Sequence, residues 1–111
     1  MEKEAHAVYR AILAAQEDRR PCALATVVAT RGSTPRKNGA MMLVDPGQGL
    51  VGTVGGGCGE AEVIEAAQEV LASGIPRMVQ VDLTDDPLSW SGSVCGGTLN
   101  VFVEPIFPEA R

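Results

Sequence analysis

Aromatic residues, histidine and excess positive charge are all scarce in this sequence, and each scarcity argues against a class of function. Only 4% of the 111 residues are aromatic, and nine Lys and Arg stand against fourteen Asp and Glu, for a net charge of −5. Nucleic-acid binding uses a basic surface and stacking rings, so we expect no nucleic-acid partner. With one His and no Cys-x-x-Cys pair, the chain lacks the ligand pattern of a closed zinc site.

Long apolar runs are missing as well. No charge-free apolar stretch approaches the roughly 20 residues that a membrane-spanning helix needs. The acidic residues at the start of the chain are unlike a secretory signal. The three cysteines, Cys22, Cys58 and Cys95, are odd in number and widely spaced, which argues against a disulfide framework. We therefore predict a cytoplasmic protein that does not bind membranes.

The patterning of the chain predicts one domain over residues 1–111, since this length suits a single core. Apolar residues recur at helical spacing over 4–17 and 60–72. Strand patterns cover 23–30, 40–44, 50–54, 78–83 and 99–103, with Pro105 expected to stop the last strand. The turn Asp45–Gly49 predicts a hairpin. The order α-β-β-β-α-β-β predicts an α+β fold with a mixed, roughly five-stranded sheet and two helices.

The first of three glycine-rich loops spans residues 31–39 and concentrates positive charge in an acidic chain. Three basic residues and two hydroxyl residues lie there: Arg31, Arg36, Lys37, Ser33 and Thr34. Charged donors, hydroxyls and exposed backbone amides favour an anion site for phosphate or carboxylate. The alternative is a solvated connection whose charges keep a sheet edge soluble.

The second loop, between a strand and a helix, holds three glycines, a cysteine and an acidic residue: Gly55, Gly56, Gly57, Cys58 and Glu60. The glycines let the backbone approach a ligand closely, and a helix start presents unsatisfied N–H groups. Cys58 stands at that start, where the helix dipole lowers the pKa of a thiol from about 8.5 toward neutrality. The alternative is a glycine-rich cap around a small buried cysteine, since Glu60 and Glu62 also suit the dipole.

The third loop ends in Cys95, Gly96 and Gly97, directly before the last strand. We predict that the three loops converge on one face and bring Cys58 and Cys95 to within about 10 Å of each other, one ligand's width. The alternative is a buried cysteine in a tight turn. Cys22 has no glycine-rich setting and is expected in the core.

Three motifs in register carry a resemblance to a known family. They are Gly32-Ser-Thr-Pro-Arg36 with Gly39, Gly52-Thr-Val-Gly-Gly-Gly-Cys58 with Glu60, and Cys95-Gly-Gly97 followed by Val101-Phe-Val-Glu-Pro105. Together they resemble the xanthine dehydrogenase accessory factor family, XdhC/CoxI, from the first helix to Pro105. Gly59 departs from the pattern, because a larger apolar residue is expected after the cysteine, and a glycine weakens a helix start.

The resemblance implies a maturation factor of xanthine dehydrogenase-type molybdenum hydroxylases. Such a factor holds the molybdenum cofactor, assists its sulfuration and delivers it to the apoenzyme, acting as a chaperone more than as a turnover enzyme. The cofactor would be carried rather than permanently bound. The residues expected around it are Ser33, Thr34, Arg36, Gly55, Gly56, Gly57, Cys58, Glu60, Cys95, Gly96 and Gly97, with Cys58 and Cys95 near molybdenum or sulfur.

Longer members of the family continue into a Rossmann-type domain, so this chain resembles their N-terminal module. That implies a separately encoded Rossmann partner, and the edge strand together with the family favours a homo-oligomer. Two alternatives remain open. One is a thiol-dependent sulfur-transfer enzyme that uses Cys58 or Cys95, and the other is a non-catalytic dimerising module that pairs with a separate Rossmann protein.

Overall fold

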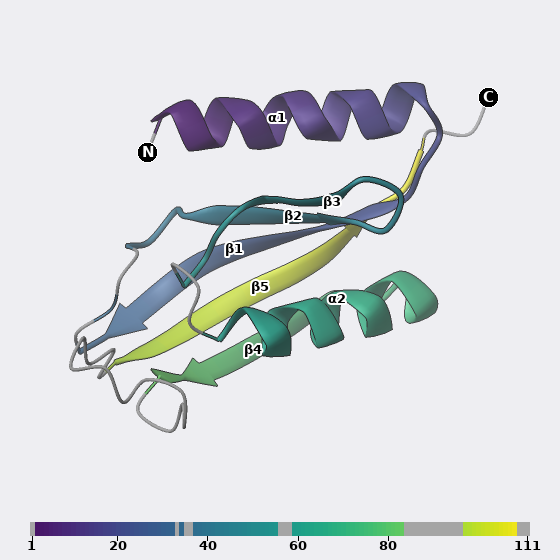
Figure 1. Cartoon of the computed structure of the whole chain (residues 1–111). Coiled ribbons are helices and arrows are strands. Elements are labelled where there is room, and N and C mark those ends of the chain that lie inside the picture. Colours follow the sequence, from purple (N-terminus) through teal and green to yellow (C-terminus); the bar gives the residue numbers. More distant parts are fainter. Residues whose placement is uncertain (1, 33, 35–36, 56–58, 84–96, 109–111) are drawn as a thin grey trace.

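One five-stranded sheet lies between two helices (Figure 1). The computed structural model describes residues 2–32, 34, 37–55, 59–83 and 97–108. Its elements are α1 (Glu2–Glu17), β1 (Cys22–Arg31), β2 (Met41–Asp45), β3 (Gly49–Gly52), α2 (Glu60–Ser73), β4 (Arg77–Asp82) and β5 (Thr98–Ile106). The α+β fold and the order α-β-β-β-α-β-β are confirmed.

The sheet has the strand order β3-β2-β1-β5-β4, and every pair of neighbours is antiparallel. The expectation of a mixed sheet was therefore wrong. A parallel pair needs a crossover connection between adjacent strands. Here the helical connection through α2 joins β3 to β4, which lie at opposite edges of the sheet, so it creates no parallel neighbours.

The last strand continues past the proline that was expected to stop it. Pro105 pairs with Ala23 of β1, and β5 ends at Ile106. On its other side, β5 loses its neighbour earlier, because pairing with β4 ends at Arg77 and Val103. A strand with one free side tolerates a residue that lacks a backbone N–H group, which is why Pro105 fits there.

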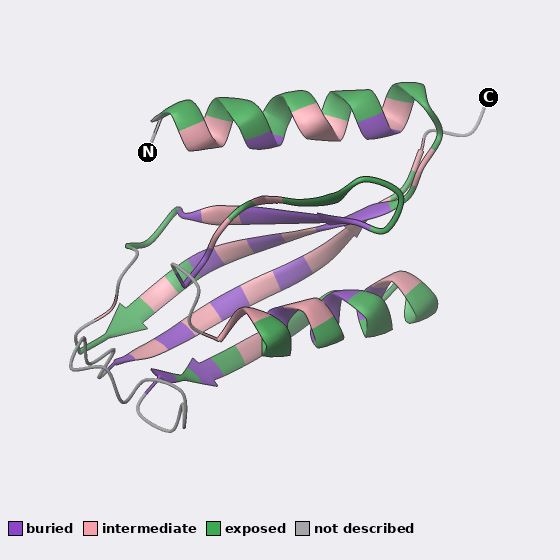
Figure 2. Cartoon of the chain, viewed as in Figure 1, coloured by how far each residue is buried: buried purple, intermediate pink, exposed green. Residues whose placement is uncertain are grey.

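The sheet face under α2 forms the larger apolar core. Helix α2 packs on β1, β5 and β4 through side chains that are buried on both sides of the interface (Figure 2). They include Val63, Ala66, Ala67 and Val70 of the helix, Ala23, Ala25 and Val27 of β1, and Leu99, Val101 and Val103 of β5. The alternation of these strand residues directs every second side chain to this core.

In the part of the chain that the structure describes, a helix covers the opposite face over about half of its width. Helix α1 packs on β2 and β3, where Val8, Ala15, Cys22 and Leu43 are buried. The prediction that Cys22 lies in the core is confirmed. Neither described helix is long and apolar enough to cross a membrane.

The other half of that face, formed by β4, β5 and the end of β1, is called the open face below. Among its residues, Met78 is 57% exposed, Gln80 is exposed, and Asn100 and Phe102 are half-buried. Figure 2 shows the exposed residues along β4. Among the described residues, α2 therefore covers one face of the sheet over β1, β5 and β4, and α1 covers the other face over β2 and β3.

Candidate functional site

The described residues that flank the first and third loops meet at one end of the sheet. Arg31, where the first loop leaves β1, is the cross-strand partner of Thr98, which opens β5 directly after the third loop. Thr98 also pairs with Asp82 at the end of β4. The N–H group of Leu83 donates to the carbonyl oxygen of Gly97 over 2.9 Å. These three strand ends are therefore held together by sheet pairing.

The second loop enters α2 at the same end. Gly59 is the N-cap of α2 and has a φ of 73°, in the left-handed region. A Cβ atom at Gly59 would collide with Cγ1 of Val81 and lie 3.2 Å from Cδ2 of Leu83. The start of α2 is thus pressed against the end of β4. A glycine is required here for a structural reason, since the position has a positive φ and no room for a side chain.

Four of the predicted site residues belong to the described part of the chain. Gly55 and Gly97 are buried, and Thr34 and Glu60 are half-buried. The remaining ones, Ser33, Arg36, Gly56, Gly57, Cys58, Cys95 and Gly96, lie outside the described residues. The approach of Cys58 to Cys95 therefore stays a prediction. Among the described residues, no three His, Cys, Asp or Glu side chains gather into a metal-binding group.

A hollow of about 290 Å³ opens beside these strand ends. It is lined by Ala29, Thr30, Arg31, Gln80, Thr98 and Asn100. Gln80 and Asn100 face each other across β4 and β5, and Ala29 is the partner of Asn100 on the other side. Because Asn100 alternates with the buried Leu99 and Val101, this hollow lies on the open face.

A β-bulge in β1 brings Arg31 to this face. The register shifts between Val27 and Ala29, which leaves Val28 without a partner in β5. Val27 points to the α2 core, and strict alternation would direct Ala29 and Arg31 there too. One extra residue reverses the alternation beyond it, so Ala29 and Arg31 share the face of Asn100 and Thr98.

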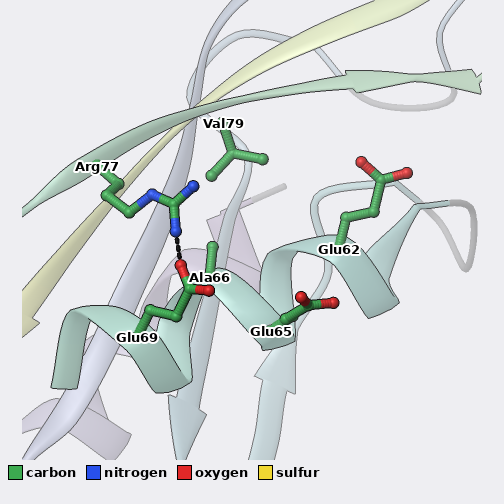
Figure 3. Close-up of a pocket in the computed structure, with 6 residues that line it drawn as sticks. All are labelled: Glu62, Glu65, Ala66, Glu69, Arg77 and Val79. Atoms are coloured by element: carbon green, nitrogen blue, oxygen red, sulfur yellow. Dashed lines mark ion pairs between the residues drawn. The ribbon is translucent and has the colours of Figure 1, made fainter. Parts of the chain in front are cut away.

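A second groove, between α2 and β4, has a different charge. It is lined by Glu62, Glu65, Glu69 and Arg77, together with Ala66 and Val79 (Figure 3). Arg77 forms an ion pair with Glu69. Three carboxylates against one guanidinium repel an anion, so this groove is a poor place for a phosphate-bearing ligand.

At the end of β2, an ion pair between Asp45 and Arg20 connects the β2–β3 hairpin to the segment that follows α1. Arg20 donates from Nη2 to Oδ2 of Asp45 over 3.1 Å, and the N–H group of Gly47 donates to Oδ1 over 3.0 Å. Burial alone would raise the pKa of Asp45, but these hydrogen bonds outweigh it and lower the pKa below its ordinary value. Burial, followed by the Asp45 charge, raises the pKa of the neighbouring Cys22 thiol.

The chain has relatives among known proteins. The sequence pattern of the XdhC and CoxI family matches residues 15–82, more than half of the chain. The chain belongs to the XdhC and CoxI family. The expected family is thereby confirmed, and the matched region includes the first two glycine-rich loops.

Three relatives of this XdhC and CoxI chain are much longer than it is. A protein of Escherichia coli (strain K12) named uncharacterized protein YqeB is 40% identical over 88 residues, which cover 79% of this chain and 16% of that protein. A protein of Bacillus subtilis (strain 168), named as a probable subunit of xanthine dehydrogenase, is 34% identical over 97 residues, 86% of this chain and 29% of that protein. A crystal structure of a xanthine dehydrogenase from Bacillus halodurans matches with a TM-score of 0.73 and 39% identity, covering 86% of this chain and 29% of that one. The chain spans less than a third of each.

Sequence reasoning had singled out Arg31 but missed the polar pair across from it. Gln80 and Asn100 belong to strands whose pairing depends on the whole topology. One signal was present: Thr98 and Asn100 place polar side chains at alternate positions of a strand that is interior in the sheet. Such alternation is expected for a strand with one face exposed.

Proposed function

We propose that this chain is the cofactor-binding module of an accessory factor for a xanthine dehydrogenase-type molybdenum hydroxylase. It would bind the molybdenum cofactor as cargo, assist its sulfuration and hand it to the apoenzyme. Family membership supports this proposal, as does the name xanthine dehydrogenase borne by two of the relatives.

The observation that carries the proposal is the meeting of the flanks of all three loops at one end of the sheet. Arg31, Gly59 and Gly97 come from distant parts of the sequence and reach this end through strand pairing and helix packing. A ligand held there would contact several loops at once, as ligands commonly do at loops carried on a rigid scaffold.

The chemistry of these residues suits the cargo. Molybdopterin combines a flat pterin, a dithiolene that holds the metal, and a phosphate. Arg31 and Lys37 are both exposed at this end and would attract the phosphate. The acidic groove between α2 and β4 lies on the covered side of the sheet, so its carboxylates line a different surface.

Within the loops, we propose roles by chemical type. Arg36, Ser33 and the backbone amides of Gly55–Gly57 would surround the phosphate, with Thr34, Glu60, Gly96 and Gly97 completing the loops. Cys58 and Cys95 would lie near molybdenum or sulfur, since soft thiolates suit a metal–sulfur centre and persulfide exchange.

The partners follow from the same role. The receiver would be the apoenzyme of a molybdenum hydroxylase, in the cytoplasm. We also propose that the module of residues 1–111 works with a Rossmann-type domain and that it self-associates. Strand β4, at one edge of the sheet, is a surface through which two copies could pair.

A cofactor-loading assay tests the proposal. The chain is incubated with isolated molybdenum cofactor and passed through a desalting column, and molybdenum and oxidised pterin are measured in the protein fraction. The proposal is supported if the protein retains roughly one cofactor per chain and can then transfer it to an apo-hydroxylase.

Two other results of the same assay would overturn it. Turnover of a persulfide donor that requires Cys58 or Cys95, without cofactor retention, would establish a sulfur-transfer enzyme. Neither retention nor turnover, with a native circular dichroism spectrum, would leave a non-catalytic module.

A further inference from the structure

The hollow on the open face carries hydrogen-bonding groups that the described fold does not use. No hydrogen bond or ion pair joins the side chains of Arg31, Gln80 or Asn100 to another described residue. Asn100 is nevertheless half-buried, on an interior strand. Polar side chains without partners in the described part of the chain, gathered around one hollow, are available to a ligand.

The arrangement of the amides defines what they would recognise. Gln80 and Asn100 are direct cross-strand partners, so their Cβ atoms are about 5 Å apart. Each side-chain amide presents an acceptor oxygen and a donor NH₂ group. Two neighbouring amides therefore offer alternating donors and acceptors, which match the edge of a flat heterocycle with an amino group, a ring nitrogen and a carbonyl in sequence.

The surroundings add an apolar surface and a charge. The Met78–Phe102 pair lies on the same strands and the same face, a thioether and an aromatic ring beside the two amides. Arg31 lies at the other end, next to Thr98 and to the first loop. A ring could lie against the apolar pair and direct an anionic substituent toward Arg31.

The size of the hollow also limits the ligand. At about 290 Å³ it lies just below the range for ligand pockets, roughly 300–1,000 Å³. That volume suits one bicyclic ring rather than a dinucleotide.

We propose that this hollow binds the aminopyrimidinone edge of a pterin. Gln80 and Asn100 form hydrogen bonds with the ring edge, and Arg31 contacts the anionic substituent. The choice of a pterin over guanine, which has the same edge, rests on the proposed function. In that case the pterin of the cargo lies on the sheet face and its phosphate at the loops.

Binding of small pterins to the full chain tests this proposal. The probes are 6-hydroxymethylpterin, its phosphate monoester and guanosine 5′-monophosphate, measured by fluorescence for the pterins and calorimetry for the nucleotide. Gln80→Leu and Asn100→Leu should each weaken pterin binding by about fivefold to fiftyfold, the loss expected for a hydrogen bond to a ligand. Gln68→Leu, the same change at an exposed position of α2, should alter it less than about twofold.

The phosphate arm tests Arg31. The phosphate ester should bind more tightly than the alcohol, and Arg31→Ala should remove that gain while leaving the alcohol unaffected. Equal loss for both probes would overturn the role of Arg31.

Two further results would overturn the pterin assignment. One is pterin binding that is absent in the natural chain or unchanged in both amide variants, with native unfolding curves. The other is guanosine monophosphate binding at least as tightly as the pterin phosphate with the same dependence on Gln80 and Asn100.

Failure of the proposed function gives a different pattern. A chain that binds pterins through Gln80 and Asn100 but does not retain the molybdenum cofactor would refute the cofactor-carrier role and keep the pterin site. A chain that retains the cofactor equally well in both amide variants would keep the cofactor-carrier role and refute the pterin site.

Discussion

The two halves of the sheet face opposite α2 differ in how they are used. Under α1, β2 and β3 present Leu43 and Val51 to the helix, and the face is apolar. Over β4 and β5 the same face presents Gln80 and Asn100, beside the flanks of the first and third glycine-rich loops. One half therefore contributes to stability, and the other offers polar groups to a ligand. Substitutions in the two halves should separate stability from binding.

The largest expected loss of stability comes from Gly59, which joins the α2 core to the loop end. Gly59→Ala should lower the free energy of unfolding by about 2–4 kcal/mol, from a left-handed backbone plus overpacking against Val81. Gly74→Ala is the matched control. Its φ of 74° is nearly the same, but its Cβ atom would lie 3.8 Å from Phe107, an ordinary contact.

Gly74→Ala should therefore lower the free energy of unfolding by only about 1 kcal/mol, which is the cost of the left-handed backbone alone. Urea denaturation of both variants gives the comparison. Equal losses of stability would show that the start of α2 can move away from β4. They would argue against a fixed meeting of the loop flanks at this end of the sheet.

Removing charge from the first loop should affect binding and spare stability. Arg36→Ala should weaken retention of the molybdenum cofactor by about 1–3 kcal/mol, as for a charge-assisted hydrogen bond. Arg36→Lys should recover part of this, because an ammonium group cannot form the paired contacts of a guanidinium.

Arg10→Ala on the exposed side of α1 is the control for this change, since it alters the net charge equally. Titration at low salt makes the difference largest. If Arg36→Ala and Arg10→Ala bind alike, the first loop is a solvated connection.

The covered half has its own electrostatic test in Asp45. Its pKa is lowered in the folded state, so the ionised carboxylate stabilises the fold at pH values above the ordinary Asp pKa of about 4. This contribution is lost as the pH falls through the lowered folded-state pKa. Asp45→Asn should cost about 1–2 kcal/mol at pH 7, and the difference from the natural chain should shrink below about pH 4.

Asp18 contacts the same Arg20 from an exposed position, so Asp18→Asn should cost less than about 0.5 kcal/mol. Thermal unfolding from pH 7 to pH 3 measures both variants. A loss for Asp45→Asn that does not change with pH would contradict the role of the charge.

The smallest expected effect lies at the end of α1. Arg19 is a residue other than glycine with a φ of 56°, a conformation that costs about 1 kcal/mol for a side-chain-bearing residue. Arg19→Gly should raise the free energy of unfolding by up to about 0.5 kcal/mol, since the gain is offset by the greater entropy of glycine in the unfolded chain. Cofactor retention should stay unchanged, and calorimetry together with the loading assay checks both.

Local patterns predicted the elements well and their partnerships less well. The helix over 60–72 is observed as Glu60–Ser73, and the turn at Asp45–Gly49 joins β2 to β3. These features depend on nearby residues. The antiparallel neighbours of β1 and the passage of β5 through Pro105 depend on contacts between distant segments, which periodicity does not encode.

The candidate site shows the same division. The glycine-rich loops were visible as composition, because each motif is contiguous. The pairing of Gln80 with Asn100 was not, because they are far apart in the sequence and only the β4–β5 register brings them together. The β-bulge at Val28, which reverses the alternation of side chains beyond it, likewise could not be predicted from the composition of the strand.

The unpaired Val28 also has a consequence for how this domain tolerates changes in length. Deleting that one residue would leave Cys22–Val27 and the hairpin in place, so the outline of the fold would survive. Beyond the deletion, Ala29 would follow Val27 directly and still pair with Asn100, so Arg31 would stay opposite Thr98 and the hollow would keep its cation. Closing the bulge at unchanged length would instead pair Val28 with Asn100 and turn Arg31 toward the α2 side, so in this domain the register of one strand decides which face of the sheet carries the charge.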